Sequence, residues 1–186
     1  METVKPKERN LFLAQQVDQE SIAKITKDII DINENDEYLK KVYAIDGLTY
    51  DPAPIKLYID SYGGYVYQCM GLLSIMEASK VPVHTIVTGV AASCGFLIAI
   101  TGHERFGYPK STFMYHQVSS GTFGTIKEME EDIMETKRLQ DMIEEITLEK
   151  TGISKKKLEK IYNSKKNLWI GSEEALKFGV IDEILS

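Results

Sequence analysis

The chain has 186 residues, of which 43% are hydrophobic and 27% charged, and this balance is typical of a globular domain. A chain of this length buries roughly 70% of its unfolded surface, so we expect one domain over residues 1–186. The formal net charge is -6, and its 22 basic residues are interspersed among 28 acidic ones. No basic surface that would neutralise phosphates is indicated, so we expect no nucleic-acid partner.

The sequence carries no sign of a membrane or secreted protein. Its start, METVKPKERN, is charged throughout, unlike a secretory signal or a membrane anchor. The longest apolar stretch, Val90 to Ile100, has about half of the roughly 20 residues that a membrane-spanning helix needs. The two cysteines, Cys69 and Cys94, indicate reduced thiols rather than a disulfide framework. We therefore expect a cytoplasmic protein that does not bind membranes.

The N-terminal half alternates helical and strand patterns. Apolar residues three or four apart predict helices over 20–36 and 65–79, each with one buried face. The stretches IKLYID, 55–60, and VHTIVTG, 83–89, are typical of buried strands. Between the first helix and the first of these strands, 36–54 contains two prolines and a glycine, which predicts an irregular connection.

The C-terminal half continues the alternation. STFMYHQ predicts a short strand, and Ile126–Lys150 predicts a long exposed helix whose incomplete apolar stripe favours packing against something outside its own domain. Two short helices follow, with Ser154 and Ser172 as expected N-caps and Gly179 as the expected stop of the second. The order of strands and helices indicates an α/β fold.

Ser93 is the candidate nucleophile for acyl transfer. This chemistry needs a hydroxyl, a base, a group that orients the base, and two N–H donors for the oxyanion. The segment GVAASCG places Ser93 before an apolar stretch that suits a buried helix, so its hydroxyl would lie at a helix N-terminus. Ala91 stands where the G-x-S-x-G motif has a glycine. From the pattern alone, a small residue that allows close helix packing is an equal alternative.

Three histidines offer a base, and their positions separate them. His116 ends a predicted strand at a loop, where functional side chains concentrate. His84 lies within a strand and His103 in a loop, and both fit structural or solvated roles. The pair Gly63 and Gly64 leaves a backbone N–H unobstructed for a substrate carbonyl, although an ordinary turn is the commoner explanation of two adjacent glycines.

Four stretches together resemble one family. LYIDSYGGYVYQCMGLLSIM, TGVAASCGFLIAITG, FMYHQ and GSEEALKFGVIDEIL are similar, in this order, to the proteolytic subunit of the ATP-dependent Clp protease. The resemblance extends from about Asn10 to Leu185. It implies that Ser93 is the nucleophile, that His116 is the base, and that the backbone N–H groups of Gly64 and Cys94 form the oxyanion hole.

The resemblance also implies an architecture and partners. The fold would be crotonase-like, built of repeated β-α-β turns, with a short N-terminal segment over 1–9 and a protruding handle helix over 125–151. Seven copies would form a ring and two rings would stack as a tetradecamer. A hexameric Clp-type ATPase would feed unfolded polypeptides into the chamber and consume the ATP. We expect no cofactor and no metal in this chain itself.

The third member of the expected catalytic triad departs from the family. Aligned backwards from EEA, the family's usual aspartate corresponds to Asn167. An amide can accept the imidazole N–H and fix its tautomer, but it lacks the charge that stabilises imidazolium. We therefore predict slower peptidase turnover than with aspartate, but not an inactive site.

Cys94 stands where the family often has methionine. Neighbouring side chains at a helix start diverge by roughly 100°, so a histidine that faces Ser93 cannot easily serve Cys94. We expect Cys94 to contribute its backbone N–H and a small apolar side chain.

Other positions also differ from the family. In the family, a strand-forming segment with proline follows the histidine-glutamine pair, binds the substrate main chain and bridges the rings. QVSSGTFG stands in its place here, so the resemblance predicts the cleft shape and the ring contacts less firmly than the nucleophile. The connection over 36–54 is longer than usual, and the N-terminal segment is short. Tyr58 matches one aromatic of the ATPase-docking pocket, whereas Lys56 replaces another.

Three functions agree with these observations. The leading hypothesis is a serine endopeptidase that cuts unfolded polypeptide inside stacked rings. A ring subunit with weak or no catalysis is the second, because of Asn167 and the altered loop. The third is a crotonase-type acyl-CoA enzyme, because paired glycine N–H groups also stabilise thioester enolates.

Overall fold

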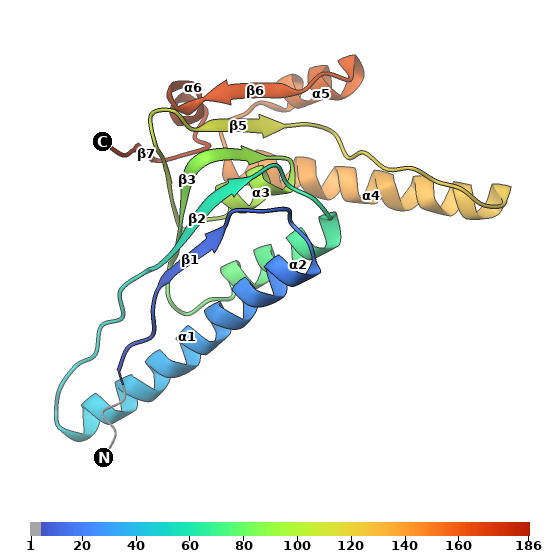
Figure 1. Ribbon diagram of the computed structural model, residues 1–186. Coiled ribbons are helices and arrows are strands. Elements are labelled where there is room, and N and C mark those ends of the chain that lie inside the picture. Colours follow the sequence, from blue (N-terminus) through green and yellow to red (C-terminus); the bar gives the residue numbers. More distant parts are fainter. Residues whose placement is uncertain (1–4) are drawn as a thin grey trace.

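A single mixed sheet organises the chain (Figure 1), and the computed structural model describes residues 5–186. The strands are β1 (Asn10–Leu13), β2 (Ile55–Ser61), β3 (Val83–Ala92), β4 (Glu104–Gly107), β5 (Thr112–Tyr115), β6 (Leu168–Gly171) and β7 (Glu183–Ile184). The helices are α1 (Gln19–Ile45), α2 (Val66–Glu77), α3 (Cys94–Ile100), α4 (Ile126–Lys150), α5 (Lys155–Ser164) and α6 (Ser172–Lys177). The predicted α/β class, with β-α-β turns and a long protruding helix, is confirmed.

Strand β3 is the centre of this sheet. The order β1-β2-β3-β4-β7 is parallel throughout. The first half of β3 pairs with β4, from His84 to Val87, and its second half pairs with β5, from Val90 to Ala92. Strand β6 then adds to β5 in the antiparallel direction. Strands β4 and β5 therefore occupy successive stretches of one edge of β3, and β2 occupies the other edge.

Alternating and helical apolar patterns fill the core. Along β2, Ile55, Leu57 and Ile59 are fully buried, while Lys56 and Asp60 on the opposite face are exposed. The isoleucines that predicted the first helix form the buried face of α1, which packs against α2. Helix α3 is buried along its whole length, as its apolar sequence predicted.

The predicted irregular connection over 36–54 is wrong for its first half, because α1 continues to Ile45. A polar cluster holds the remainder of this connection. The buried Asp36 carboxylate accepts hydrogen bonds from the Arg9 guanidinium and from the Tyr50 hydroxyl, the latter at 3.0 Å. The prolines therefore end the excursion rather than interrupt the helix, and the turn is tied back to the chain before β1.

The N-terminal segment runs beside α1 (Figure 1). Of the predicted segment 1–9, residues 1–4 lie outside the described part of the chain. The backbone N–H of Lys7 donates to the Asn35 side chain at 3.2 Å, and its ammonium group lies 3.0 Å from Asp31. Among the residues that the structure describes, no helix combines the length and the apolar character needed to cross a membrane.

Helix α4 matches the predicted long helix and projects away from the sheet (Figure 1). Thr125 caps its start: the side chain accepts from the Glu128 N–H, and Glu128 reaches back to the Thr125 N–H. All of its buried side chains lie in the second half, at Leu139, Gln140, Ile143 and Thr147. The first half therefore contributes no buried side chain to the core.

The predicted N-cap role of Ser172 is wrong, whereas that of Ser154 is confirmed. Helix α6 begins at Ser172 itself, after Gly171, and no side chain caps it. The buried Ser172 hydroxyl instead donates to the Tyr108 carbonyl at 2.6 Å, which fixes α6 to the β4–β5 connection. Ser154 accepts from the N–H of Lys157, as predicted.

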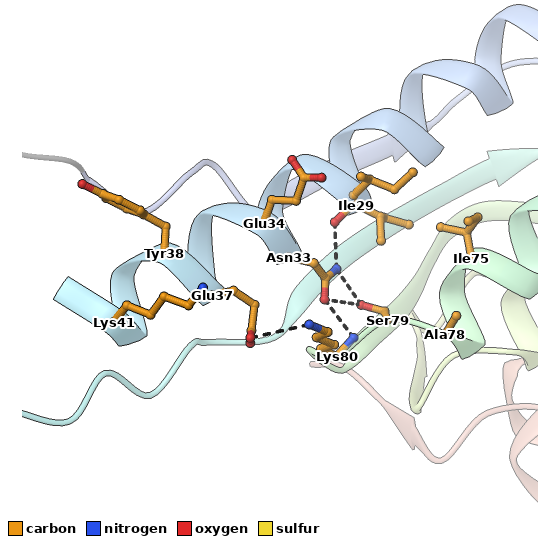
Figure 2. A pocket seen from close by; sticks show the side chains of 11 residues that line it. Ile29, Asn33, Glu34, Glu37, Tyr38, Lys41, Ile75, Ala78, Ser79 and Lys80 are labelled. Carbon is orange, nitrogen blue, oxygen red and sulfur yellow. Dashed lines mark hydrogen bonds and ion pairs between the residues drawn. The ribbon is translucent and has the colours of Figure 1, made fainter. Parts of the chain in front are cut away.

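A groove of about 510 Å³ lies between α1 and the end of α2 (Figure 2). Asn33 crosses its floor: its amide donates to the Ile29 carbonyl at 2.7 Å and its oxygen accepts from the Lys80 N–H at 2.8 Å. Of the described residues that line the groove, none is a histidine or a cysteine. The groove therefore holds no serine–histidine or cysteine–histidine pair among these residues.

Candidate active site

Parallel pairing of β3 with β5 brings Ser93 and His116 together. Ala92 on β3 lies opposite Met114 on β5, so both strands end at the same edge of the sheet. Ser93 follows the first strand directly, and His116 follows the second. His116 Nε2 lies 2.8 Å from Ser93 Oγ, within hydrogen-bonding distance. Two residues 23 positions apart thus form a hydroxyl–imidazole pair.

The backbone of Ser93 adopts a conformation that non-glycine residues rarely take. Its φ is 55° and its ψ is -122° at the junction of β3 and α3. Such strain persists only where the surroundings impose it, and it clusters at functional sites. Here the Ser93 N–H donates to the Met114 carbonyl at 2.9 Å. The sharp strand-to-helix turn therefore exists although Ala91 replaces the glycine of the usual motif.

Gly63 packs too closely on this turn to carry a side chain. Its φ is 94°, and a Cβ there would lie 2.6 Å from the Ala92 carbonyl and 2.8 Å from the Cys94 nitrogen. The Ser61 hydroxyl accepts from the Gly63 N–H at 3.1 Å and holds it in place. Gly63 is therefore required because its backbone contacts the Ser93 turn, and not only because of the turn in which it lies itself.

Gly64 is fixed by the segment before α1. The Val17 N–H donates to the Gly63 carbonyl at 2.9 Å, and the Val17 carbonyl accepts from the Tyr65 N–H at 2.8 Å. This parallel bridge leaves the Gly64 N–H outside the pair. A Cβ on Gly64 would lie 2.2 Å from the Val17 carbonyl, so only glycine fits. The predicted oxyanion donor is thus held rigidly beside the cavity that Ser93 lines.

Both cysteines are buried and free, as predicted. The Cys94 thiol donates to the Gly64 carbonyl at 3.3 Å, and the Cys69 thiol donates to the Cys94 carbonyl at 3.5 Å. The interaction with Cys94, together with burial, raises the pKa of the Cys69 thiol, whereas the hydrogen bond from Cys69 lowers the pKa of Cys94. The Cys94 side chain is therefore engaged with the Gly64 loop.

The environment of His116 favours its neutral form. Partial burial lowers the pKa of this imidazole below its ordinary value of 6.5. A neutral imidazole is the form that accepts a proton from a hydroxyl. The other two histidines lie elsewhere: the N–H of Val83 donates to His103 Nδ1 at 3.1 Å, and His84 faces Glu104 at 3.5 Å.

Asn167 lies near His116 but is not bonded to it. Strands β5 and β6 pair antiparallel with Tyr115 opposite Leu168, so the next position along would place Asn167 across from His116. Asn167 is exposed, and within residues 5–186 no hydrogen bond joins its amide to the imidazole. Its orienting role remains a prediction.

A cavity of about 310 Å³ opens at the Ser93–His116 pair. Gly64, Cys94 and His116 line one part of it with Ser93. Its other walls are mainly apolar or aromatic: Tyr62, Val66, Leu97, Met114, Tyr115, Val118 and Ile143. The cavity therefore offers an apolar space beside a polar reactive centre.

Within the described part of the chain, no group of three or more histidine, cysteine, aspartate or glutamate side chains is arranged to hold a metal ion. The groups that do converge are a strained serine, an imidazole whose pKa is lowered by burial, and two crowded glycines on a crotonase-like α/β fold. This arrangement defines the class of serine-hydrolase-like sites.

The chain belongs to the Clp protease family. The sequence model of that family matches residues 4–186, nearly the whole chain. This match confirms the resemblance read from the four sequence stretches.

Two curated relatives support the assignment. The chain is 32% identical over 133 residues to an ATP-dependent Clp protease proteolytic subunit 2 of Treponema denticola, covering 70% of this chain and 66% of that protein. It is also 32% identical over 133 residues to an ATP-dependent Clp protease proteolytic subunit of Deinococcus radiodurans, covering 70% and 64%. The matched stretch thus spans slightly less than two thirds of either relative.

Sequence reasoning missed one residue of the site. Gln140 on α4 is buried, and its amide oxygen accepts from the Val118 N–H at 2.8 Å, directly after the His116 segment. Its only sequence signal was a polar residue on the inner side of an amphipathic helix. Which loop it meets is a property of the tertiary structure.

Proposed function

We propose that the chain is the proteolytic subunit of an ATP-dependent Clp-type protease, a serine endopeptidase that hydrolyses unfolded polypeptides to short peptides. The observation that carries this proposal is the 2.8 Å contact between Ser93 Oγ and His116 Nε2 at a strained strand-to-helix turn. The family membership supports the same chemistry. It also disfavours an acyl-CoA enzyme, for which the serine–histidine contact would have no use.

In the proposed mechanism, Ser93 Oγ attacks the carbonyl carbon of the scissile peptide bond while His116 Nε2 takes its proton. The N–H groups of Gly64 and Cys94 stabilise the oxyanion of the tetrahedral intermediate. The imidazolium then gives its proton to the leaving amine, and an acyl ester on Ser93 remains. A water molecule, deprotonated by His116, hydrolyses this ester and regenerates the hydroxyl.

Asn167 is the proposed third member. In this role its amide oxygen would accept the imidazole N–H, which would fix the tautomer that leaves Nε2 free to accept a proton. The absence of a hydrogen bond between Asn167 and His116 also favours the second candidate, a ring subunit with weak or no catalysis. The two candidates differ in one measurable property, the reactivity of Ser93.

The proposed assembly is two stacked heptameric rings joined through α4. The exposed first half of α4 supports this, since Ile126, Ile133 and Met134 are at least half exposed on a helix that projects from its own domain. For the hexameric ATPase we propose docking near Tyr58, which stacks on the exposed Phe12 ring at 5.2 Å between centroids. Tyr58 is thus the partly buried member of an aromatic pair whose other ring, Phe12, is exposed.

The remaining parts of the proposal follow from the same assignment. The chain would be a single cytoplasmic peptidase domain over 1–186. ATP would be used by the partner ATPase, with no cofactor in this chain.

The test is active-site labelling combined with native mass measurement. A fluorophosphonate should label the parent protein, and Ser93→Ala should lose both the label and the cleavage of a fluorogenic peptide. About fourteen copies per particle are expected for two closed rings. An unlabelled parent in an intact particle would favour the inactive ring subunit. Activity that survives in Ser93→Ala but is abolished by iodoacetamide would make Cys94 the nucleophile.

A further inference from the structure

The chain after His116 lies extended along α4 and is joined to it at regular intervals. The Val118 N–H donates to Gln140 Oε1 at 2.8 Å, and the Ser120 hydroxyl lies 3.0 Å from that of Thr136. Further on, the Thr122 hydroxyl donates to Asp132 at 2.5 Å. Figure 1 shows this connection from β5 running along α4 to the start of the helix. We call these three pairs the α4 zipper.

The spacing of the α4 zipper follows from elementary geometry. Its partners advance by two residues on the extended chain and step back by four on the helix. Two residues of extended chain span about 6.6 Å, and four residues of α-helix span about 6.0 Å. An antiparallel extended segment therefore meets one helix face at every second residue. Because the repeat has this physical basis, the three contacts form one structure.

Gln140 is the buried end of the α4 zipper and the end nearest His116. Its side chain is only 8% exposed, whereas the other two pairs are exposed. Its Nε2 also points toward the hydroxyl of the buried Tyr115 at 3.5 Å. One amide thus contacts the residue before His116 and the second residue after it.

Apart from the packing of Val118 against the core, few other restraints act on this segment. Outside regular helices and strands, no backbone–backbone hydrogen bond within the described chain involves residues 116–124. A buried polar side chain costs free energy unless its hydrogen bonds are made, so an apolar residue would serve packing alone equally well. The burial of Gln140 is therefore explained by the bond it makes to Val118.

We propose that Gln140 is a positioning residue, which fixes the backbone after His116 to α4 and so holds the imidazole on Ser93. The same bond accounts for a departure in sequence. Where the family has proline after the histidine-glutamine pair, this chain has Val118, whose N–H needs an acceptor that proline would not. Gln140 supplies that acceptor. The catalytic part of this inference rests on the proposed peptidase function.

The experiment compares four full-length variants. Gln140→Leu keeps the volume and removes the acceptor, while Gln140→Glu keeps an acceptor oxygen. Thr136→Val removes a hydroxyl from the exposed part of the α4 zipper and serves as the matched control. Val118→Pro combined with Gln140→Leu removes the N–H that the leucine leaves unpaired.

Three readouts separate positioning from folding. Hydrogen–deuterium exchange over 116–124 should become faster in Gln140→Leu, whereas the thermal unfolding transition should stay cooperative. The kcat for a fluorogenic peptide should fall about tenfold with KM within about twofold, since small displacements of a catalytic group cost rate. Thr136→Val should change kcat less than about twofold. Gln140→Glu should keep most of the parent kcat. The double variant should recover most of the kcat that Gln140→Leu loses.

The outcomes distinguish this inference from the proposed function. Unchanged exchange or an unchanged kcat in Gln140→Leu would overturn the positioning role. An equal loss of kcat in Gln140→Leu, in Gln140→Glu and in the double variant would also overturn it, because that loss would be an effect of packing. A parent that neither cleaves peptide nor accepts a fluorophosphonate would overturn the peptidase proposal, and exchange would still report whether Gln140 holds the segment.

Discussion

The two sides of His116 are built differently. On the Nε2 side, Ser93 is held in a strained turn, and Gly63 packs against that turn with no room for a Cβ. On the opposite side, Asn167 is exposed and makes no bond to the imidazole within the described chain. Backbone packing determines the first side, and a single surface side chain next to β6 determines the second.

This difference indicates where the site tolerates change. A position fixed by backbone contacts fails when one atom is added, because the neighbouring atoms are themselves held by hydrogen bonds. At a position occupied by an exposed amide, substitutions change the activity by small factors, because no packed neighbour has to move. The nucleophile side should therefore respond steeply to substitution, and the orienting side should respond gradually.

The largest effect is expected from Gly63→Ala. The added Cβ would meet the Ala92 carbonyl at 2.6 Å and the Cys94 nitrogen at 2.8 Å, and both belong to the Ser93 turn. We expect kcat/KM to fall on the order of 100-fold, since displacement of about 1 Å costs that much. The matched control is Gly71→Ala, because nothing lies within 4 Å of a Cβ there on α2. Equal peptidase rates for the two variants would show that the Ser93 turn is not rigid.

An intermediate effect is expected from Asn167→Asp. A carboxylate would stabilise the imidazolium that forms during catalysis, so we expect kcat/KM to rise about tenfold. Asn167→Ala should lower it by a smaller factor, because the amide makes no hydrogen bond to the imidazole in this structure. The measurement is hydrolysis of a fluorogenic peptide. If both variants match the parent, Asn167 has no orienting role.

The smallest effect is expected in the pH dependence. Burial lowers the pKa of His116 below 6.5, so the neutral base persists to lower pH than a solvated histidine would allow. The acid limb of kcat/KM should therefore have its midpoint below pH 6.5. Asn167→Asp should move that midpoint upward, since a nearby negative charge favours imidazolium. A parent midpoint above 6.5 would mean that a charge, rather than burial, controls the imidazole.

Much of the secondary structure followed from local patterns. Apolar spacing located the helices α1, α2 and α4, and the strands β2 and β3, because each buries one face or a continuous run. The end of α1 was misjudged, because the glycine and two prolines of 36–54 predicted an irregular connection over the whole stretch, whereas all three lie after the last helical residue, Ile45. The short strands β1, β4, β6 and β7 were not anticipated, because strands this brief depend on their neighbours for pairing.

By itself, the sequence determined the family, the α/β class, and Ser93 and His116 as the candidate pair, because short ordered motifs carry that information locally. The tertiary structure decided three further matters. It brought Ser93 and His116 to 2.8 Å through the pairing of β3 with β5. It gave Gly63 its role through contact with the Ser93 turn, and it placed Gln140 against the segment after His116. Each depends on atoms that are far apart along the chain, and only the packing of the fold sets their distances.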